Sequence, residues 1–301
     1  MRYIVTSYVD PDLDGTSSMY AYSEFLRKTG KDSDYYIAGT PMQEVQIVCD
    51  MFHIALKGAE EIGDEDKVVV VDTNDLELIP VEKLENIVEF IDHHIKYNNS
   101  EKCKNAKFQI EMVGAAASLV AEKFQKNDVE ISRESAILLY YGIISNTINL
   151  KAKVTTQKDL EMTKWLKEKC GEVSEEKIAE IFTKKSQIRD SLRDEMEAQV
   201  VREFQNKKIT IAQLEYANVE SFLLENESKI REILSEIKRE KNLDYILINC
   251  VDILKGFSTI LVIDDETEKL ISELLNVKFE KQKARFNELI LRKEIYRMLD
   301  E

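Results

Sequence analysis

Three short apolar runs, each followed by aspartate, constrain the fold of this chain more than any other feature. They are YIVT at residues 3–6, ahead of SYVDPDLDGTSS, then KVVVVD at 67–72 and IVEFID at 87–92. Helical patterns alternate with these runs, such as GTSSMYAYSEFLRKTG at 15–30, which has one apolar face. Near-continuous apolar strands that alternate with helices predict an α/β fold with a parallel sheet.

The residues that close these runs are the candidates for chemistry. In chain order they are Asp12, Asp14, Asp72, Asp92, His93 and His94. An aspartate after a strand is, by itself, more typical of a turn or a helix cap. The carboxyl ends of parallel strands meet at one edge of a sheet, so these side chains are expected to converge. Carboxylates and imidazoles without cysteine suit Mn²⁺, Mg²⁺, Co²⁺ or Fe²⁺ better than structural zinc.

Length and composition limit the classes of protein. The 301 residues are enough for one large domain or two ordinary ones, and the net charge of -15 argues against nucleic acid or an anionic membrane as the main partner. The sequence has no run of eighteen apolar residues and no signal peptide pattern, which predicts a cytoplasmic protein. The four cysteines show no CxxC spacing and are expected to be reduced structural thiols.

A change of pattern along the chain predicts two domains. Residues 156–200 are highly charged and helical in period, and new strand patterns follow, such as KKITIAQLEY and GFSTILVID. We predict domains at 1–185 and 193–301, the second being a smaller α/β or α+β domain.

Four ordered segments resemble the motifs of the DHH phosphoesterase superfamily. They are YVDPDLD, VVVVDTND, FIDHH and YGIISNTINLKAKVTTQKD, and EMVGAAASLVAEKF resembles the segment before the fourth motif. The branch that the chain resembles most is the manganese-dependent (family II) inorganic pyrophosphatases and their exopolyphosphatase relatives. REFQNKKITIAQLE, DYILINCVDILKGFSTILV and a late LRK resemble the DHHA2 domain. The resemblance implies a DHH catalytic domain followed by a DHHA2 substrate-binding domain.

The resemblance also implies a role for each motif residue. The implied metal ligands are Asp12, Asp14, Asp72, His93 and Asn146, and the implied substrate contacts are His94, Arg202, Arg292 and Lys293. Asp12 would bind a first ion, Asp14 and His93 a second, and Asp72 both. Asp72 and His94 are therefore the expected catalytic residues. Asp92 would orient the two histidines, and the ions would be Mn²⁺ or Mg²⁺, with Co²⁺ as a further candidate.

Four positions depart from the family pattern. Tyr8 stands where the pyrophosphatases have a metal-binding histidine, and Asn146 where they have a metal-binding aspartate. A phenol, whose pKa is about 10, is a poor ligand, and an amide carbonyl supplies no charge. In the late motif, Leu291 replaces a serine and Glu294 a second lysine, which weakens the binding of a polyanion. These departures predict weaker metal sites, with the His93 site the better occupied.

Three functions remain open on the sequence. The first is a metal-dependent hydrolase of phosphoric anhydrides, acting on inorganic pyrophosphate or short polyphosphate through a metal-activated water. The second is a DHH phosphoesterase with another phosphate or a nucleotide as substrate. The third is a catalytically weak binding or regulatory homologue. The expected partner is a small anionic phosphate compound, and a homodimer is compatible with the sequence.

Overall fold

The computed structural model describes residues 1–94, 103–171, 173–187, 191–197 and 201–300. It divides into two compact units. The first contains Met1–Leu150 and Val154–Ile181, and the second contains Lys151–Lys153 and Phe182–Glu301. Residues 188–190, which fall between the two predicted domains, lie outside the described part of the chain.

The first unit contains a five-stranded parallel sheet in the order β2-β1-β3-β4-β5. Its strands are β1 (Tyr3–Thr6), β2 (Ser33–Tyr36), β3 (Lys67–Val71), β4 (Ile87–Asp92) and β5 (Lys107–Ile110). Its helices are α1 (Leu13–Lys28), α2 (Gln43–Phe52), a short 3₁₀ helix (Leu84–Asn86), α3 (Ala116–Lys126), α4 (Arg133–Asn146), α5 (Gln157–Cys170) and α6 (Glu175–Lys185), which continues into the second unit. The predicted α/β fold with a parallel sheet is confirmed.

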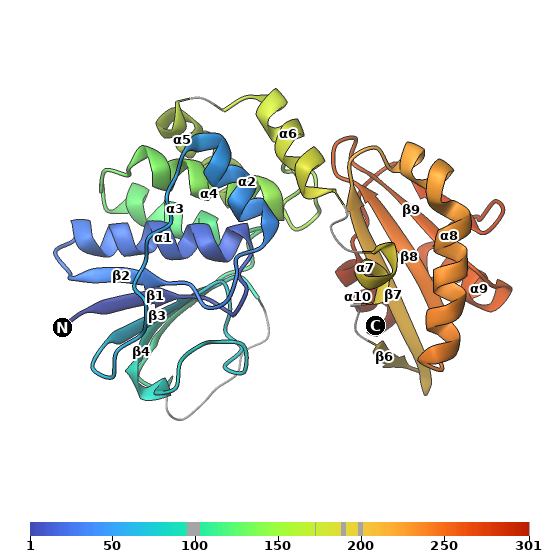
Figure 1. Cartoon of the computed structure of the whole chain (residues 1–301), viewed down its shortest axis with the longest axis horizontal. Helices are drawn as coiled ribbons and strands as arrows, with labels where there is room; N and C mark the ends of the chain where they lie inside the picture. Colours follow the sequence, from blue (N-terminus) through green and yellow to red (C-terminus); the bar gives the residue numbers. More distant parts are fainter. Residues whose placement is uncertain (95–102, 172, 188–190, 198–200, 301) are drawn as a thin grey trace. The chain divides into compact units, whose positions relative to one another are not determined.

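Burial explains why the central strands are so apolar. The valines of β3 are buried on both faces of the sheet. Helices α1, α3, α4 and α5 lie on one side of the sheet (Figure 1). The loop between β3 and β4 covers the other side, where Ile79 packs on Val68 and Phe90. Helices α1 and α4 approach closely, since a Cβ on Gly142 would lie 2.6 Å from Ser17 Oγ.

The second unit contains a mixed sheet in the order β10-β9-β8-β7-β6, in which only β7 and β8 are parallel. Its strands are β6 (Val201–Phe204), β7 (Lys207–Tyr216), β8 (Tyr245–Asp252), β9 (Phe257–Val262) and β10 (Lys283–Phe286). Its helices are α7 (Leu192–Glu197), α8 (Val219–Glu240), α9 (Asp265–Leu275) and α10 (Arg292–Asp300). Helix α8 covers one face (Figure 1), and residues of α9 and α10 pack with the core of the other.

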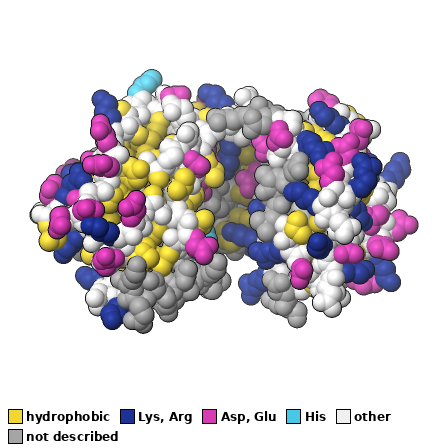
Figure 2. Space-filling view, turned by 60° about the horizontal axis from the view of Figure 1, so that its bottom comes forward, with side chains coloured by type: hydrophobic (Ala, Val, Ile, Leu, Met, Phe, Trp, Pro, Cys, Tyr) yellow, Lys and Arg dark blue, Asp and Glu magenta, His cyan; other side chains and the backbone are white. Residues whose placement is uncertain are grey.

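The surface of the second unit carries charges of both signs. Figure 2 shows its Lys, Arg, Asp and Glu side chains interspersed on the visible face. Among the helices that the structure describes, none combines the length and the apolar character needed to cross a membrane.

Candidate metal centre

Two aspartates of the first motif are held by helix ends. Asp12 is the N-cap of α1, and its carboxylate accepts a hydrogen bond of 3.0 Å from Gly15 N. Asp14 lies in the first turn of α1 and is buried. Its carboxylate accepts hydrogen bonds from Ala116 N (2.9 Å) and Ala117 N (2.7 Å) at the start of α3. Because no side chain at its own N-cap caps α3, Asp14 supplies the acceptor for its first amides.

Asp72 follows β3 at the same edge of the sheet. Its backbone has a φ of 60°, a left-handed conformation that aspartate tolerates better than most residues. The side chain is buried, and its Oδ1 atom has no hydrogen-bond partner among the described residues. Burial raises the pKa of Asp72 well above its ordinary value, and the nearby carboxylates of Asp14 and Asp12 raise it further. An unshared pair of electrons on a buried carboxylate points to a missing cation or proton.

His93 presents one ring nitrogen to these carboxylates. Its Nδ1 atom lies 2.9 Å from the Val113 carbonyl, which can only accept, so Nδ1 carries the proton. In the neutral ring Nε2 then has a lone pair, and it lies 3.2 Å from Asp72 Oδ1 and 3.7 Å from Asp14 Oδ2. Adjacent ligands of an octahedral ion lie about 3 Å apart. The spacing of these three electron-pair donors therefore fits a divalent metal ion.

Asp92 fixes the positions of His93 and His94 through hydrogen bonds. It is fully buried, and its Oδ1 atom accepts hydrogen bonds from His93 N (2.7 Å), His94 N (3.2 Å) and His94 Nδ1 (2.8 Å). Burial alone would raise the pKa of Asp92, but these bonds with His94 outweigh it and lower the pKa. Asn74 donates to Asp92 Oδ2 at 2.6 Å and to the His94 carbonyl at 3.0 Å. Sequence reasoning missed the role of Asn74, although it lies in the quoted motif VVVVDTND.

Two of the four departures from the family pattern, Tyr8 and Asn146, lie beside the carboxylates. Tyr8 Oη accepts a hydrogen bond of 3.2 Å from Asp12 N. Burial, with Asp12 and Asp72 nearby, raises the pKa of Tyr8, so its phenol stays protonated. Asn146, at the end of α4, donates to Asp14 Oδ2 at 2.8 Å and to the Gly114 carbonyl at 3.1 Å. Tyr8 and Asn146 are therefore each hydrogen-bonded to an aspartate of the first motif.

The centre as a whole brings together most of the residues that the strand-end pattern singled out. Asp72, Asp92, His93 and His94 each offer a ligand atom within 4.8 Å of the others, and together they could hold a metal ion. Asp92 is already occupied by its hydrogen bonds. The metal position expected at Asp14, Asp72 and His93 is called the second position below, and the one expected at Asp12 and Asp72 is called the first position.

The part of the chain that contains this centre matches a known protein family. Residues 2–143 match the model of the DHH family, N-terminal domain. Those residues form a DHH domain. They contain β1, β3 and β4 and thus the Asp and His residues of both metal positions.

Relatives match the chain beyond the DHH domain. A manganese-dependent inorganic pyrophosphatase from Bacillus subtilis is 26% identical over 302 residues, which span 97% of this chain and 96% of the relative. A Streptococcus thermophilus protein assigned the same activity is 27% identical, again over 97% and 96% of the two chains. The crystal structure of a Methanococcus jannaschii protein assigned to the family II inorganic pyrophosphatases is similar over the full length of both chains, with a TM-score of 0.70 and 25% identity.

The second unit contains the cationic residues expected to bind substrate. Arg292 and Lys293 begin α10, and neither side chain has a hydrogen bond or ion pair with any described residue. The Arg292 N–H donates to Gln213 Oε1 at 2.6 Å, which fixes the start of the helix. The Arg202 guanidinium lies 4.3 Å from the ring centre of Tyr296, one turn further along α10. All three cations are thus associated with one helix.

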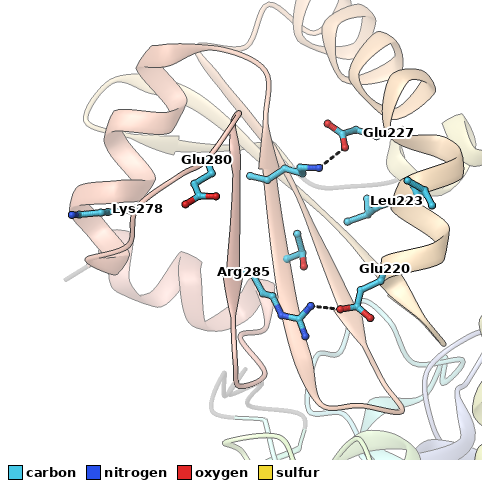
Figure 3. Close-up of a pocket in the computed structure, with 9 residues that line it drawn as sticks. Glu220, Leu223, Glu227, Lys278, Glu280 and Arg285 are labelled. Atoms are coloured by element: carbon cyan, nitrogen blue, oxygen red, sulfur yellow. Dashed lines mark hydrogen bonds and ion pairs between the residues drawn. The ribbon is translucent and has the colours of Figure 1, made fainter.

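A separate cavity of about 550 Å³ lies between α8 and β10 in the same unit (Figure 3). Its charges are paired across the cavity, because Lys283 binds Glu227 at 2.6 Å and Arg285 binds Glu220. None of the residues predicted to bind metal or substrate lines it.

Proposed function

We propose that the protein is a metal-dependent hydrolase of phosphoric anhydrides, acting on inorganic pyrophosphate or short polyphosphate. The observation that carries the proposal is the convergence of His93 Nε2, Asp72 Oδ1 and Asp14 Oδ2 at one buried point of the DHH domain. The manganese-dependent pyrophosphatases among the relatives support the same chemistry and the choice of Mn²⁺ or Mg²⁺.

The residues of this chain would hold the ion and bind the substrate. Asp14, Asp72 and His93 would hold the ion, which would supply Lewis acidity for the activation of water and for the stabilisation of phosphoryl charge. His94 Nδ1–H donates to Asp92, and this bond raises the pKa of His94. In the protonated ring Nε2 would then donate to a phosphate oxygen. Arg292 and Lys293 would bind the remaining oxygens, since neither side chain makes a hydrogen bond or a close ion pair with a described residue.

A different phosphate substrate is the second candidate, and Glu294 favours it. Its carboxylate accepts a hydrogen bond of 2.7 Å from Leu291 N at the start of α10. A carboxylate at this helix end repels anions next to Arg292. A phosphate monoester or a nucleotide monophosphate, whose total negative charge is smaller, would tolerate this better than polyphosphate does.

A phosphate-release panel tests the proposal. Pyrophosphate, tripolyphosphate, a nucleotide monophosphate and a nucleotide triphosphate are each supplied with Mn²⁺, Mg²⁺ or Co²⁺, and an Arg292→Ala variant serves as the control. We expect the highest kcat/KM for pyrophosphate or tripolyphosphate with Mn²⁺ or Mg²⁺, and a higher KM in the variant. Preferential release from the monophosphate would establish the second candidate. A chain that releases phosphate from none of them would be a binding or regulatory homologue.

A further inference from the structure

We infer that Tyr8 and Asn146 are hydrogen-bonded at the two motif aspartates and do not bind an ion, because Tyr8 accepts from the Asp12 N–H and Asn146 donates to the Asp14 carboxylate. The side chains of the centre therefore hold one divalent ion. This goes beyond the proposed function and shares with it only the presence of a metal. The ion lies at the second position, where His93 and Asp72 face one another.

The orientation of Asn146 follows from its partners. Its amide nitrogen lies within hydrogen-bond distance of Asp14 Oδ2 and of the Gly114 carbonyl. Both of these oxygens only accept, so the NH₂ group and not the amide oxygen must face them. An NH₂ group has no lone pair for a metal. Asn146 therefore neutralises part of the charge of Asp14 at the place where an aspartate ligand would have added charge.

Asp14 is nearly saturated by these contacts. Its Oδ2 atom accepts from Ala116 N and from Asn146, and its Oδ1 atom accepts from Ala117 N. A carboxylate has about four acceptor sites, so three donors leave about one for an ion. We therefore assign His93 and Asp72 as the main ligands of the second position, with Asp14 as a weaker third.

The first position has fewer metal ligands than the second. Tyr8 Oη accepts a hydrogen bond from Asp12 N, which occupies the phenol oxygen at this position. Asp12 in turn accepts from Gly15 N as the cap of α1. The first position thus keeps two carboxylates and no imidazole, and one of those carboxylates has other partners. Such an all-oxygen site binds Mn²⁺ or Mg²⁺ weakly unless the ion brings further ligands, as a phosphate-bound ion does.

Counting bound Mn²⁺ tests this inference without any assay of hydrolysis. Equilibrium dialysis and electron paramagnetic resonance are applied to the full chain and to three variants, Tyr8→His, Tyr8→Phe and Asn146→Asp. We expect one tightly bound Mn²⁺ per chain, with no spin-coupled signal from a pair of ions. Tyr8→His should add a second tightly bound ion. Asn146→Asp should lower the dissociation constant of the ion at the second position by about 10-fold or more. Tyr8→Phe should leave the count at one.

Two results would overturn the inference. One is a spin-coupled pair of Mn²⁺ ions of equal affinity in the unmodified chain, and this needs no variant to fold. The other is a Tyr8→His variant, folded by circular dichroism, that still binds one ion. A chain that binds one ion and hydrolyses no anhydride would refute the proposed function and leave this inference standing.

Discussion

The Val113 carbonyl decides what His93 can bind. By accepting from Nδ1 at 2.9 Å it fixes the tautomer, and it leaves Nε2 as an electron-pair donor toward Asp72. Asp92 fixes the backbone of the histidine pair, and Asn74 fixes Asp92. The position of one ligand nitrogen therefore depends on a chain of buried hydrogen bonds.

Asn74→Ala should weaken metal binding without touching a ligand. The change removes the donor to Asp92 Oδ2 and to the His94 carbonyl. We expect the dissociation constant for Mn²⁺ to rise about 10-fold or more, with a loss of unfolding free energy of about 1–3 kcal/mol. Asn86→Ala is the control, since Asn86 donates to a backbone carbonyl on the surface of the same unit. Equal Mn²⁺ affinity in the two variants would show that Asn74 has no role at the centre.

Sequence reasoning could find the titratable side chains of this site but not its backbone hydrogen-bond donors. The aspartates and histidines were found because they carry titratable side chains at the ends of apolar strands. Ala116 and Ala117 could not be found, because they act through backbone amides that any residue type supplies. The direction of the Asn146 amide was also beyond sequence reasoning, since it depends on which acceptors surround it.

The segment 111–115, between β5 and α3, together with the first residues of α3, holds His93 and Asp14 in place. It supplies the Val113 carbonyl to His93 and the first amides of α3 to Asp14. Gly114 lies between them and allows a close approach, because a Cβ there would lie 2.5 Å from Thr147 Cγ2 and 2.9 Å from Asp159 Oδ2. Asp159 accepts from Gly114 N at 2.8 Å and thereby ties the segment to α5.

Gly114→Ala should therefore displace this segment. We expect a rise of about 10-fold in the dissociation constant for Mn²⁺, measured by equilibrium dialysis, because both sets of contacts shift together. Adding Thr147→Ser removes the methyl group that the new Cβ would meet and keeps the hydroxyl that bonds to Ile143 O. The double variant should recover part of the affinity. Unchanged affinity in the single variant would mean that the segment tolerates the Cβ.

Glu24 joins α1 to the start of α4 and makes stability depend on pH. Burial alone would raise the pKa of Glu24, but hydrogen bonds from Ser132, Ser135 and Lys28 outweigh it and lower the pKa. A lowered pKa contributes stability above the ordinary glutamate range, and this is lost as the pH falls through the folded-state pKa. Glu24→Gln should cost about 1–3 kcal/mol at pH 7. Urea unfolding should show a smaller difference at about pH 4, and a difference independent of pH would contradict this.

Three short strands at sheet edges were not revealed by the sequence. The long helices and central strands follow from their apolar periods, as in α8 and β8. Strands β5, β6 and β10 are four residues long and lie at sheet edges, where one face or more is polar. Such strands exist because a neighbouring strand offers hydrogen bonds, and that neighbour is not visible in the local pattern.

At the scale of the whole molecule, each unit has its own hydrophobic core and its own share of the proposed chemistry. The DHH domain in the first unit has the candidate metal ligands, and the second unit has Arg292 and Lys293. The chain is acidic overall, so a small anionic substrate would have to be attracted locally by the ion and these two cations.

Calorimetry should separate the two units. We expect two unfolding transitions, and Mn²⁺ should raise the midpoint of one of them, because the candidate metal ligands among the described residues lie in the first unit. At a free concentration 100 times the dissociation constant, the added stability is about 2.7 kcal/mol. An Asp72→Asn variant should lose this shift. An equal shift of both transitions would mean that the second unit also binds the ion.

The most direct test of the central claim is the rate of phosphate release from pyrophosphate by the unmodified chain and by Asp72→Asn, with Mn²⁺ present. Asparagine matches aspartate in shape and tolerates the left-handed backbone at this position, so the variant removes the charge and leaves the fold. Asp72 is expected to serve both metal positions, so we predict a fall in kcat/KM of about 100-fold or more. Undiminished phosphate release by a folded Asp72→Asn variant would contradict the assignment of this centre.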